Sequence, residues 1–101
     1  MKKHELTPDE REQKLLDVAR QLLTEEISEG QALRILRRDV LGLSQDAYAK
    51  LVGISRRTLS DLERNRANMT LDAMNRVYRP LGLRVGLLPR QRALLERALE
   101  Q

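Results

Sequence analysis

The sequence predicts an all-α fold of five to six short helices with one short β-strand near the C-terminus. Three observations predict this fold. Apolar residues recur at helical spacing through most of the 101-residue chain. Serine, threonine and glycine stand where those segments begin and end, as helix caps do. Only residues 83–88 change to the alternating pattern of a strand.

Composition limits the class of protein. At 101 residues, with no Cys, Phe or Trp, we expect one domain, or one domain with a helical appendage, around an aliphatic core. No apolar run approaches the ~18 residues that span a bilayer, so we expect a soluble, cytoplasmic protein without membrane contact. His4 is the only histidine and has no companion ligands. We therefore expect no metal, no cofactor and no enzyme, since no catalytic triad or glycine-rich phosphate loop is present.

Basic charge is concentrated after residue 30. Residues 1–30 carry five Lys/Arg and eight Asp/Glu, a net charge of −3, whereas residues 31–101 carry fourteen Lys/Arg and seven Asp/Glu, a net charge of +7. Thirteen of those fourteen cations are arginine, whose planar fork suits bidentate contacts to phosphates and bases. This distribution is typical of a module that binds nucleic-acid phosphates.

Residues 1–27 are predicted to be an N-terminal helical extension. Thr7 caps a helix that runs to about Leu23, with Pro8 at its first position and Glu10 closing a capping box. An apolar stripe on this helix needs a covering surface. We expect this stripe either to pack against the chain's own domain or a dimer mate, or to be a docking surface for a different protein. The stripe consists of Leu15, Val18, Ala19, Leu22 and Leu23.

A second capped helix is predicted from about Glu29 to Leu41. Ser28 and Gln31 form its capping box, and Gly42 ends it. The residues expected to face the core are Ala32, Leu33, Leu36 and Val40, while Arg34 and Arg37 are expected to face outward.

Residues 43–65 organise the chain, because they read as two short helices joined by a tight turn. Ser44 caps a helix from Gln45 to about Val52. Gly53 supplies the left-handed backbone that ends it, and Ser55 caps a second helix from Arg56 to about Asn65. The residues expected to pack inward are Ala47, Tyr48, Leu51, Val52, Ile54, Leu59 and Leu62.

The outer face of the second of these helices is polar and basic. Arg56, Arg57, Ser60, Asp61 and Arg64 share it. Helix N-termini favour anions, and arginine forks fit guanine O6 and N7 in the major groove. Four arginines between residues 56 and 66 also fit the solvated face of an ordinary helical protein. The glycine turn and the two caps favour a helix-turn-helix with this helix as the recognition helix.

The rest of the chain is predicted to hold a helix, a strand and a last helix. Thr70 caps the helix, which packs through Leu71, Met74, Val77 and Tyr78 and ends near Pro80 and Gly82. Residues 28–82 thus form the helix-turn-helix DNA-binding domain, and residues 83–101 the strand and helix of a dimerisation segment. A lone strand needs a partner, so Leu83, Val85 and Leu87 are expected to pair with a second subunit. The apolar face of the last helix, residues 90–101, comprises Ala93, Leu94, Ala98 and Leu99.

The motif resembles the Xre-type, phage Cro/repressor-like helix-turn-helix family, over about residues 31–88. The matching anchors are Leu43, Ser44, Gln45, Ala49, Gly53, Ile54, Ser55, Leu59, Ser60, Leu62 and Glu63. This resemblance implies a repressor-like fold and a set of DNA-binding residues. Gln45 matches a phosphate contact, and Arg56, Arg57 and Asp61 match base-reading positions. Thr58, Ser60 and Arg64 match positions nearer to the phosphates. Arg66 and Asn68 lie in the loop that often touches the DNA backbone, and Ser55 is a further DNA-binding candidate.

Two positions carry alternatives. Family members often hold a basic residue against the glutamate of the recognition helix, which implies an Arg38–Glu63 lock; otherwise Arg38 is solvated. Asp61 departs from a phosphate-binding pattern. It can accept from a cytosine N4 amine, or it can orient Arg57 or Arg64 through a salt bridge.

The predicted function is a sequence-specific regulator of double-stranded DNA, a repressor acting as a homodimer on an inverted repeat. The alternative is an antitoxin that binds a toxin protein and autoregulates its operon, as the resemblance to the antitoxin branch of the family implies. An RNA reader is disfavoured, because the outer face of residues 56–64 carries none of the aromatic residues on which single-stranded bases stack.

Overall fold

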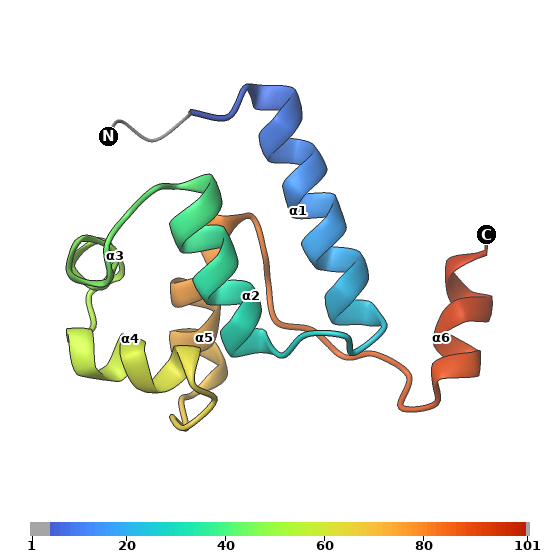
Figure 1. The fold of residues 1–101 in the computed structure, drawn as a ribbon. Coiled ribbons are helices and arrows are strands. Elements are labelled where there is room, and N and C mark those ends of the chain that lie inside the picture. The colour runs from blue at the N-terminus through green and yellow to red at the C-terminus, as the bar shows by residue number, and fades with distance from the viewer. Residues whose placement is uncertain (1–4, 101) are drawn as a thin grey trace.

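A computed structural model describes residues 5–100 of the chain and is helical. Helices α2 to α5 form one cluster, α1 lies along α2, and α6 stands apart at the end of an extended linker (Figure 1). His4, for which we expect no metal role, lies outside the described residues. The elements are α1 (Pro8–Leu23), α2 (Glu29–Ile35), the π-helix η1 (Leu36–Val40), α3 (Gln45–Val52), α4 (Arg56–Glu63), α5 (Leu71–Tyr78), the 3₁₀-helix η2 (Arg79–Leu81) and α6 (Arg92–Leu99).

Side chains cap the first five α-helices as predicted. The hydroxyls of the N-cap residues each accept a hydrogen bond from a backbone N–H in the first turn, which satisfies one of the donors left over at a helix start. Both predicted capping boxes are closed, by Glu10 and by Gln31. Gly53 ends α3 with φ 75°, so the tight turn of the motif is confirmed. The five N-caps are Thr7, Ser28, Ser44, Ser55 and Thr70.

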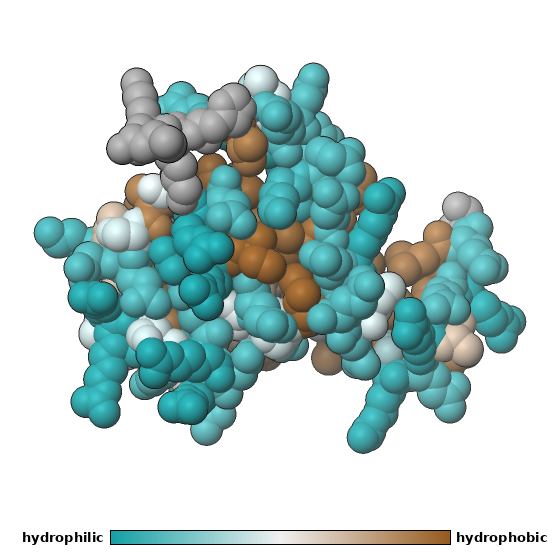
Figure 2. Space-filling model, in the orientation of Figure 1, coloured by the Kyte–Doolittle hydropathy of each residue, from teal (hydrophilic) through white to brown (hydrophobic). Residues whose placement is uncertain are grey.

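One aliphatic core unites α1 with the helix-turn-helix. Val18 of α1 is 1% exposed and belongs to the same cluster as Leu33, Tyr48 and Leu59. Hydrophobic residues are visible in the seam between α1 and α2 (Figure 2). The apolar stripe of α1 is therefore covered by the chain's own domain, although Leu16 beside it remains 43% exposed.

The second predicted helix is not continuous. It changes from α2 to the π-helix η1 at residue 36, where the Leu41 N–H bonds the Leu36 carbonyl five residues back. Leu36 and Arg37 are both buried in this wider turn. The expectation that Arg37 faces outward is therefore wrong, and the reason is its position four residues after the buried Leu33, on the same helix face.

The predicted strand at residues 83–88 is not formed, and no strand occurs within residues 5–100. Instead Leu83 packs against the chain's own core, and the Val85 N–H donates to Asn75 Oδ1 of α5 at 2.8 Å. These contacts hold the segment against the chain's own domain. Leu87 is fully exposed. Period-2 spacing here marks an extended segment lying against the domain, and the pairing of Leu83, Val85 and Leu87 with a second subunit stays a prediction.

Some inward positions were also predicted wrongly. Ala47, Leu51 and Leu71 are exposed, because α3 buries Tyr48, Ala49 and Val52, and α5 buries only its last turn. The predicted apolar face of α6 is exposed as well, whereas Leu95 is the one buried residue of this helix. No helix within residues 5–100 is both long and apolar enough to cross a membrane.

Candidate nucleic-acid interface

Helix α4 has one buried face and one solvent-facing face. Leu59 is 0% exposed and Leu62 is 5% exposed, and both belong to the central core. Ser55 caps its N-terminus by accepting from the Thr58 N–H at 3.0 Å. Ile54, in the turn before it, is half-buried against the same core. These contacts hold the helix by its underside and leave its opposite face available to a ligand.

Two arginines stand at the exposed N-terminal end of α4. Arg56 and Arg57 are both exposed. Arg56 Nη1 lies 3.7 Å from Asp46 Oδ2 of α3, and both side chains are more than 60% exposed. An ion pair this open contributes little to stability, so a phosphate or a base can displace the carboxylate. Positive charge at a helix N-terminus strengthens the existing preference of that end for anions.

The other predicted DNA contacts surround this end or follow α4. Ser55 is exposed, while Thr58, Ser60 and Asp61 are half-buried along the outer face. The Asp61 carboxylate forms no ion pair within 4.0 Å inside residues 5–100, so a salt bridge to Arg57 or Arg64 is not formed. Three further exposed residues are Arg64, Arg66 and Asn68.

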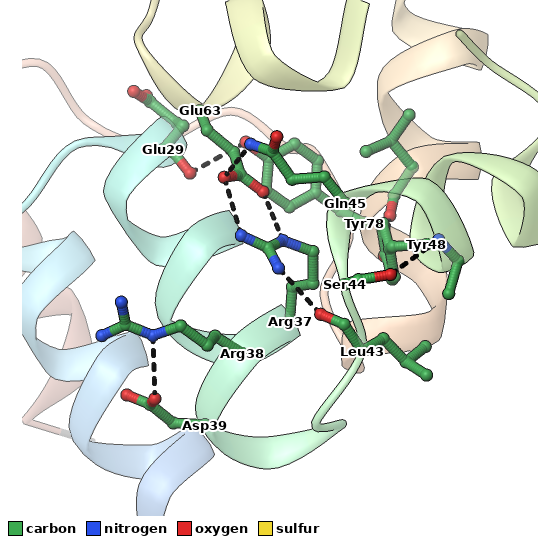
Figure 3. A network of polar contacts seen from close by, with 12 residues as sticks. Glu29, Arg37, Arg38, Asp39, Leu43, Ser44, Gln45, Tyr48, Glu63 and Tyr78 are labelled. Carbon is green, nitrogen blue, oxygen red and sulfur yellow. Dashed lines mark hydrogen bonds and ion pairs between the residues drawn. The ribbon is translucent and has the colours of Figure 1, made fainter. Parts of the chain in front are cut away.

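A buried ion pair joins η1 to α4 (Figure 3). Arg37 Nε donates to Glu63 Oε2 at 2.6 Å, and Arg37 Nη2 donates to Glu63 Oε1 at 3.0 Å. Arg37 Nη1 also donates to the Leu43 carbonyl at 2.7 Å. Because both side chains are less than 10% exposed, the bidentate geometry must compensate for their lost hydration.

The predicted Arg38–Glu63 lock is therefore wrong by one residue. Arg38 points away from Glu63, and its Nε lies 3.4 Å from Asp39 Oδ1 on the exposed surface. Arg37 pairs with Glu63 because it lies four residues after Leu33, and this spacing turns its side chain toward the core. The helical register of the buried leucines was the signal that identifies the correct arginine.

Gln45 belongs to the same network. Its Nε2 donates to Glu63 Oε1 at 3.0 Å from the first turn of α3, so the amide position is fixed by the ion pair beneath it. An amide nitrogen carries two hydrogens, and the second is available to a phosphate. The predicted phosphate role of Gln45 remains a prediction, now with a defined geometry.

Gly30 and Asn65, which the sequence reading passed over, fix α2 against the end of α4. The Gly30 N–H donates to Asn65 Oδ1 at 3.0 Å, and Asn65 Nδ2 donates to Ser28 Oγ at 2.9 Å. A Cβ on Gly30 would lie 2.5 Å from the Leu62 carbonyl oxygen. Asn65 has φ 59°, a left-handed conformation that asparagine tolerates better than most residues. A glycine inside a predicted helix and an asparagine just after α4 are the two sequence features that could have indicated this contact.

Two buried tyrosines tie the helices behind this surface. The Tyr48 hydroxyl donates to the Val77 carbonyl, and the Tyr78 hydroxyl donates to the Glu29 carbonyl at 2.9 Å. Burial, together with the charge of Glu63, raises the pKa of Tyr48 to about 12. Burial also raises the pKa of Tyr78, with a further contribution from Glu29. Both phenols therefore stay neutral donors over the physiological range.

Comparison with known families supports this geometry. A family model described as helix-turn-helix matches residues 33–88. The matched range includes α3, the Gly53 turn and α4, and it leaves out α1 and α6. No curated protein and no solved structure matches the chain.

Proposed function

We propose that this protein is a sequence-specific transcriptional repressor that acts on double-stranded DNA as a homodimer. The chain belongs to the family of Xre/Cro-like helix-turn-helix DNA-binding domains. The observation that carries the proposal is the exposed pair Arg56 and Arg57 at the start of α4, a helix seated on the core by Leu59 and Leu62. In this geometry α4 enters the major groove. We further propose that the protein acts in the cytoplasm, as a binding protein and not as an enzyme.

The division of labour between base and phosphate contacts can be tested directly. A preferred duplex is first selected from a randomised pool, and binding isotherms are then measured on it and on a scrambled duplex. Arg57→Ala should lose roughly 1–3 kcal/mol on the preferred duplex and little on the scrambled one, because a bidentate base contact is lost. Gln45→Ala should weaken both duplexes alike, because phosphates carry no sequence information. Equal losses on both duplexes for Arg57→Ala would contradict the base-reading assignment.

A homodimer is proposed because one short helix reads few base pairs. Two recognition helices related by a two-fold axis, about 34 Å apart, would read an inverted repeat. The surface proposed for contact is the set of exposed leucines near the C-terminus: Leu87, Leu88, Leu94 and Leu99 are 102%, 58%, 47% and 60% exposed. Light scattering should show a dimer for the full chain and a monomer for Leu94→Gln/Leu99→Gln. If the double variant is still a dimer, α6 is not part of the dimer interface.

Repression is proposed because a dimer on an operator excludes RNA polymerase from an overlapping site. A reporter driven by a promoter that contains the selected duplex should lose expression when the protein is present. Arg57→Ala, which keeps the fold but loses the base contact, should restore expression. Increased expression with the parent protein would contradict repression.

An antitoxin role is the second candidate. Its support is narrower than the sequence suggested, because the stripe of α1 is already covered by the chain's own core through Val18. The exposed leucines at residues 87–99 remain as a surface that a toxin protein could cover. Co-purification with the product of an adjacent short reading frame would favour this role over a stand-alone repressor.

A further inference from the structure

A pocket of about 360 Å³ opens between α2, η1, α3 and α4. Its floor is the buried Arg37–Glu63 pair with the amide of Gln45 hydrogen-bonded to it. Because the two charges of the pair oppose each other, the floor contributes no net charge. The rim consists of Arg34, Arg38, Ser60 and Arg64. The lining therefore holds four arginines against one glutamate, a net charge of +3.

The position of Arg34 follows from the contact between α2 and α4. Arg34 lies four residues after Gly30, on the same face of α2. Gly30 touches the last turn of α4 so closely that no side chain fits, and Asn65 bonds its N–H. Arg34 is thereby held beside the C-terminal end of α4, where Arg64 begins the following loop.

The pocket is continuous with the surface that we assign to DNA. Ser60 lies on the outer face of α4, Arg64 is the C-cap residue of that helix, and Gln45 opens α3. Arg34 and Arg64 are exposed, so their guanidinium groups can converge on an anion without breaking the buried pair. The second amide hydrogen of Gln45 is a third donor within the same lining.

Gln45 is already the expected phosphate contact in this lining, and we propose that Arg34, a residue outside the two-helix motif, is a second, positioning contact to that backbone phosphate of double-stranded DNA. The inference rests on the proposed function of the chain as a DNA reader. A phosphate held at this place fixes how deeply and at what angle α4 enters the groove, because phosphate contacts set orientation. Arg34 thus links the seating of α2 to the register of the recognition helix.

The test is the salt dependence of binding for the full chain with Arg34→Gln. Fluorescence anisotropy is measured on the selected and the scrambled duplex between 50 and 200 mM KCl. Loss of one phosphate contact should make the negative slope of log K against log salt shallower by ~0.9, equally on both duplexes. Arg34→Lys keeps the charge and should retain most of the slope. Arg20→Gln is the matched control, since it removes an exposed arginine from the last turn of α1 and should leave the slope unchanged.

The outcomes separate this inference from the broader proposal. A parent protein that binds DNA with an Arg34→Gln slope equal to that of the parent and of Arg20→Gln overturns the phosphate pocket and leaves the function standing. A parent that binds neither duplex overturns both. A change on the selected duplex alone would assign Arg34 to base reading and overturn its phosphate role. Thermal unfolding of Arg34→Gln should match the parent, because the replaced side chain is exposed.

Discussion

The helix-turn-helix body and the C-terminal segment of this chain differ in how completely they are held in place. In residues 28–82 every α-helix starts at a side-chain cap and contributes fully buried residues to one core. In residues 83–100, α6 starts at Gln91 without a side-chain cap and buries only Leu95. The body orients its α4 arginines by itself. An eight-residue helix with so little packing is marginal alone, so a further contact would add to the stability of α6.

The largest expected difference between the regions concerns the buried ion pair of the body. Arg37→Met should destabilise the protein by roughly 3–5 kcal/mol, because Glu63 is left buried without its cation. Arg38→Met, one residue along on the exposed surface, should change stability by less than about 0.5 kcal/mol. Urea unfolding followed by far-ultraviolet circular dichroism measures both. Similar losses for the two variants would show that the pair contributes no more than a surface charge.

Glycines in the two regions provide the next comparison. Gly30→Ala should destabilise the protein by about 1–3 kcal/mol or more, because its Cβ would meet backbone oxygens of Leu62 and Glu63 at 2.5 and 2.8 Å. Gly86→Ala in the linker meets nothing within 4 Å and should be neutral or slightly stabilising. Thermal unfolding of the two variants tests this difference. A tolerated alanine at residue 30 would mean that α2 and α4 can separate without loss.

The body should also respond to alkaline pH, since both tyrosines of the chain lie in it. Burial raises the pKa of Tyr48 from 10.0 to about 12, so folding favours the neutral phenol. That contribution, on the order of 1–3 kcal/mol, is fully present below pH 10 and is lost as pH rises toward 12.

Urea midpoints measured from pH 8 to 11.5 should therefore stay level and then fall above pH 10. Tyrosinate absorbance recorded in parallel should appear only as the protein unfolds. Ionisation of both phenols near pH 10 in protein that is still folded would contradict the buried positions of Tyr48 and Tyr78.

The smallest effect is expected in α6. Leu94→Ala/Leu99→Ala should change the stability of the monomer by less than about 0.5 kcal/mol, because both side chains are exposed. Leu33→Ala, at 0% exposure in the body, should lose about 2–5 kcal/mol. Unfolding at low protein concentration, where any dimer dissociates, makes the comparison. A large loss in the double variant would show that α6 is packed more firmly than its exposure indicates.

Local rules predicted the body well and failed where tertiary contacts decided. Cap residues and Gly53 act on their own neighbours, so Ser44, Ser55 and Thr70 were identified from the sequence. The four-residue spacing from Leu33 favoured Arg37 over Arg38, whereas the π-helical turn of η1 and the contact with Glu63 are features that no local pattern contains.

The C-terminal segment shows a similar limit of local rules. Alternating Leu83, Val85 and Leu87 fit a strand by spacing, yet the Val85 N–H found its partner in Asn75, ten residues earlier in α5. Spacing predicts an extended backbone, and the partner decides whether a strand forms. The candidate DNA contacts were predictable as positions on α4, whereas the pocket beside Arg34 required the close approach of Gly30 to α4.

The central claim is that the N-terminal end of α4 contacts DNA, and amide chemical shifts during titration with the selected duplex test it most directly. The largest changes should fall on Arg56, Arg57 and Ser60, with further changes at Gln45 and Arg34, and almost none on α1 or the linker before α6. Shifts confined to α1 or α6, with the amides of α4 unmoved at saturation, would contradict the account.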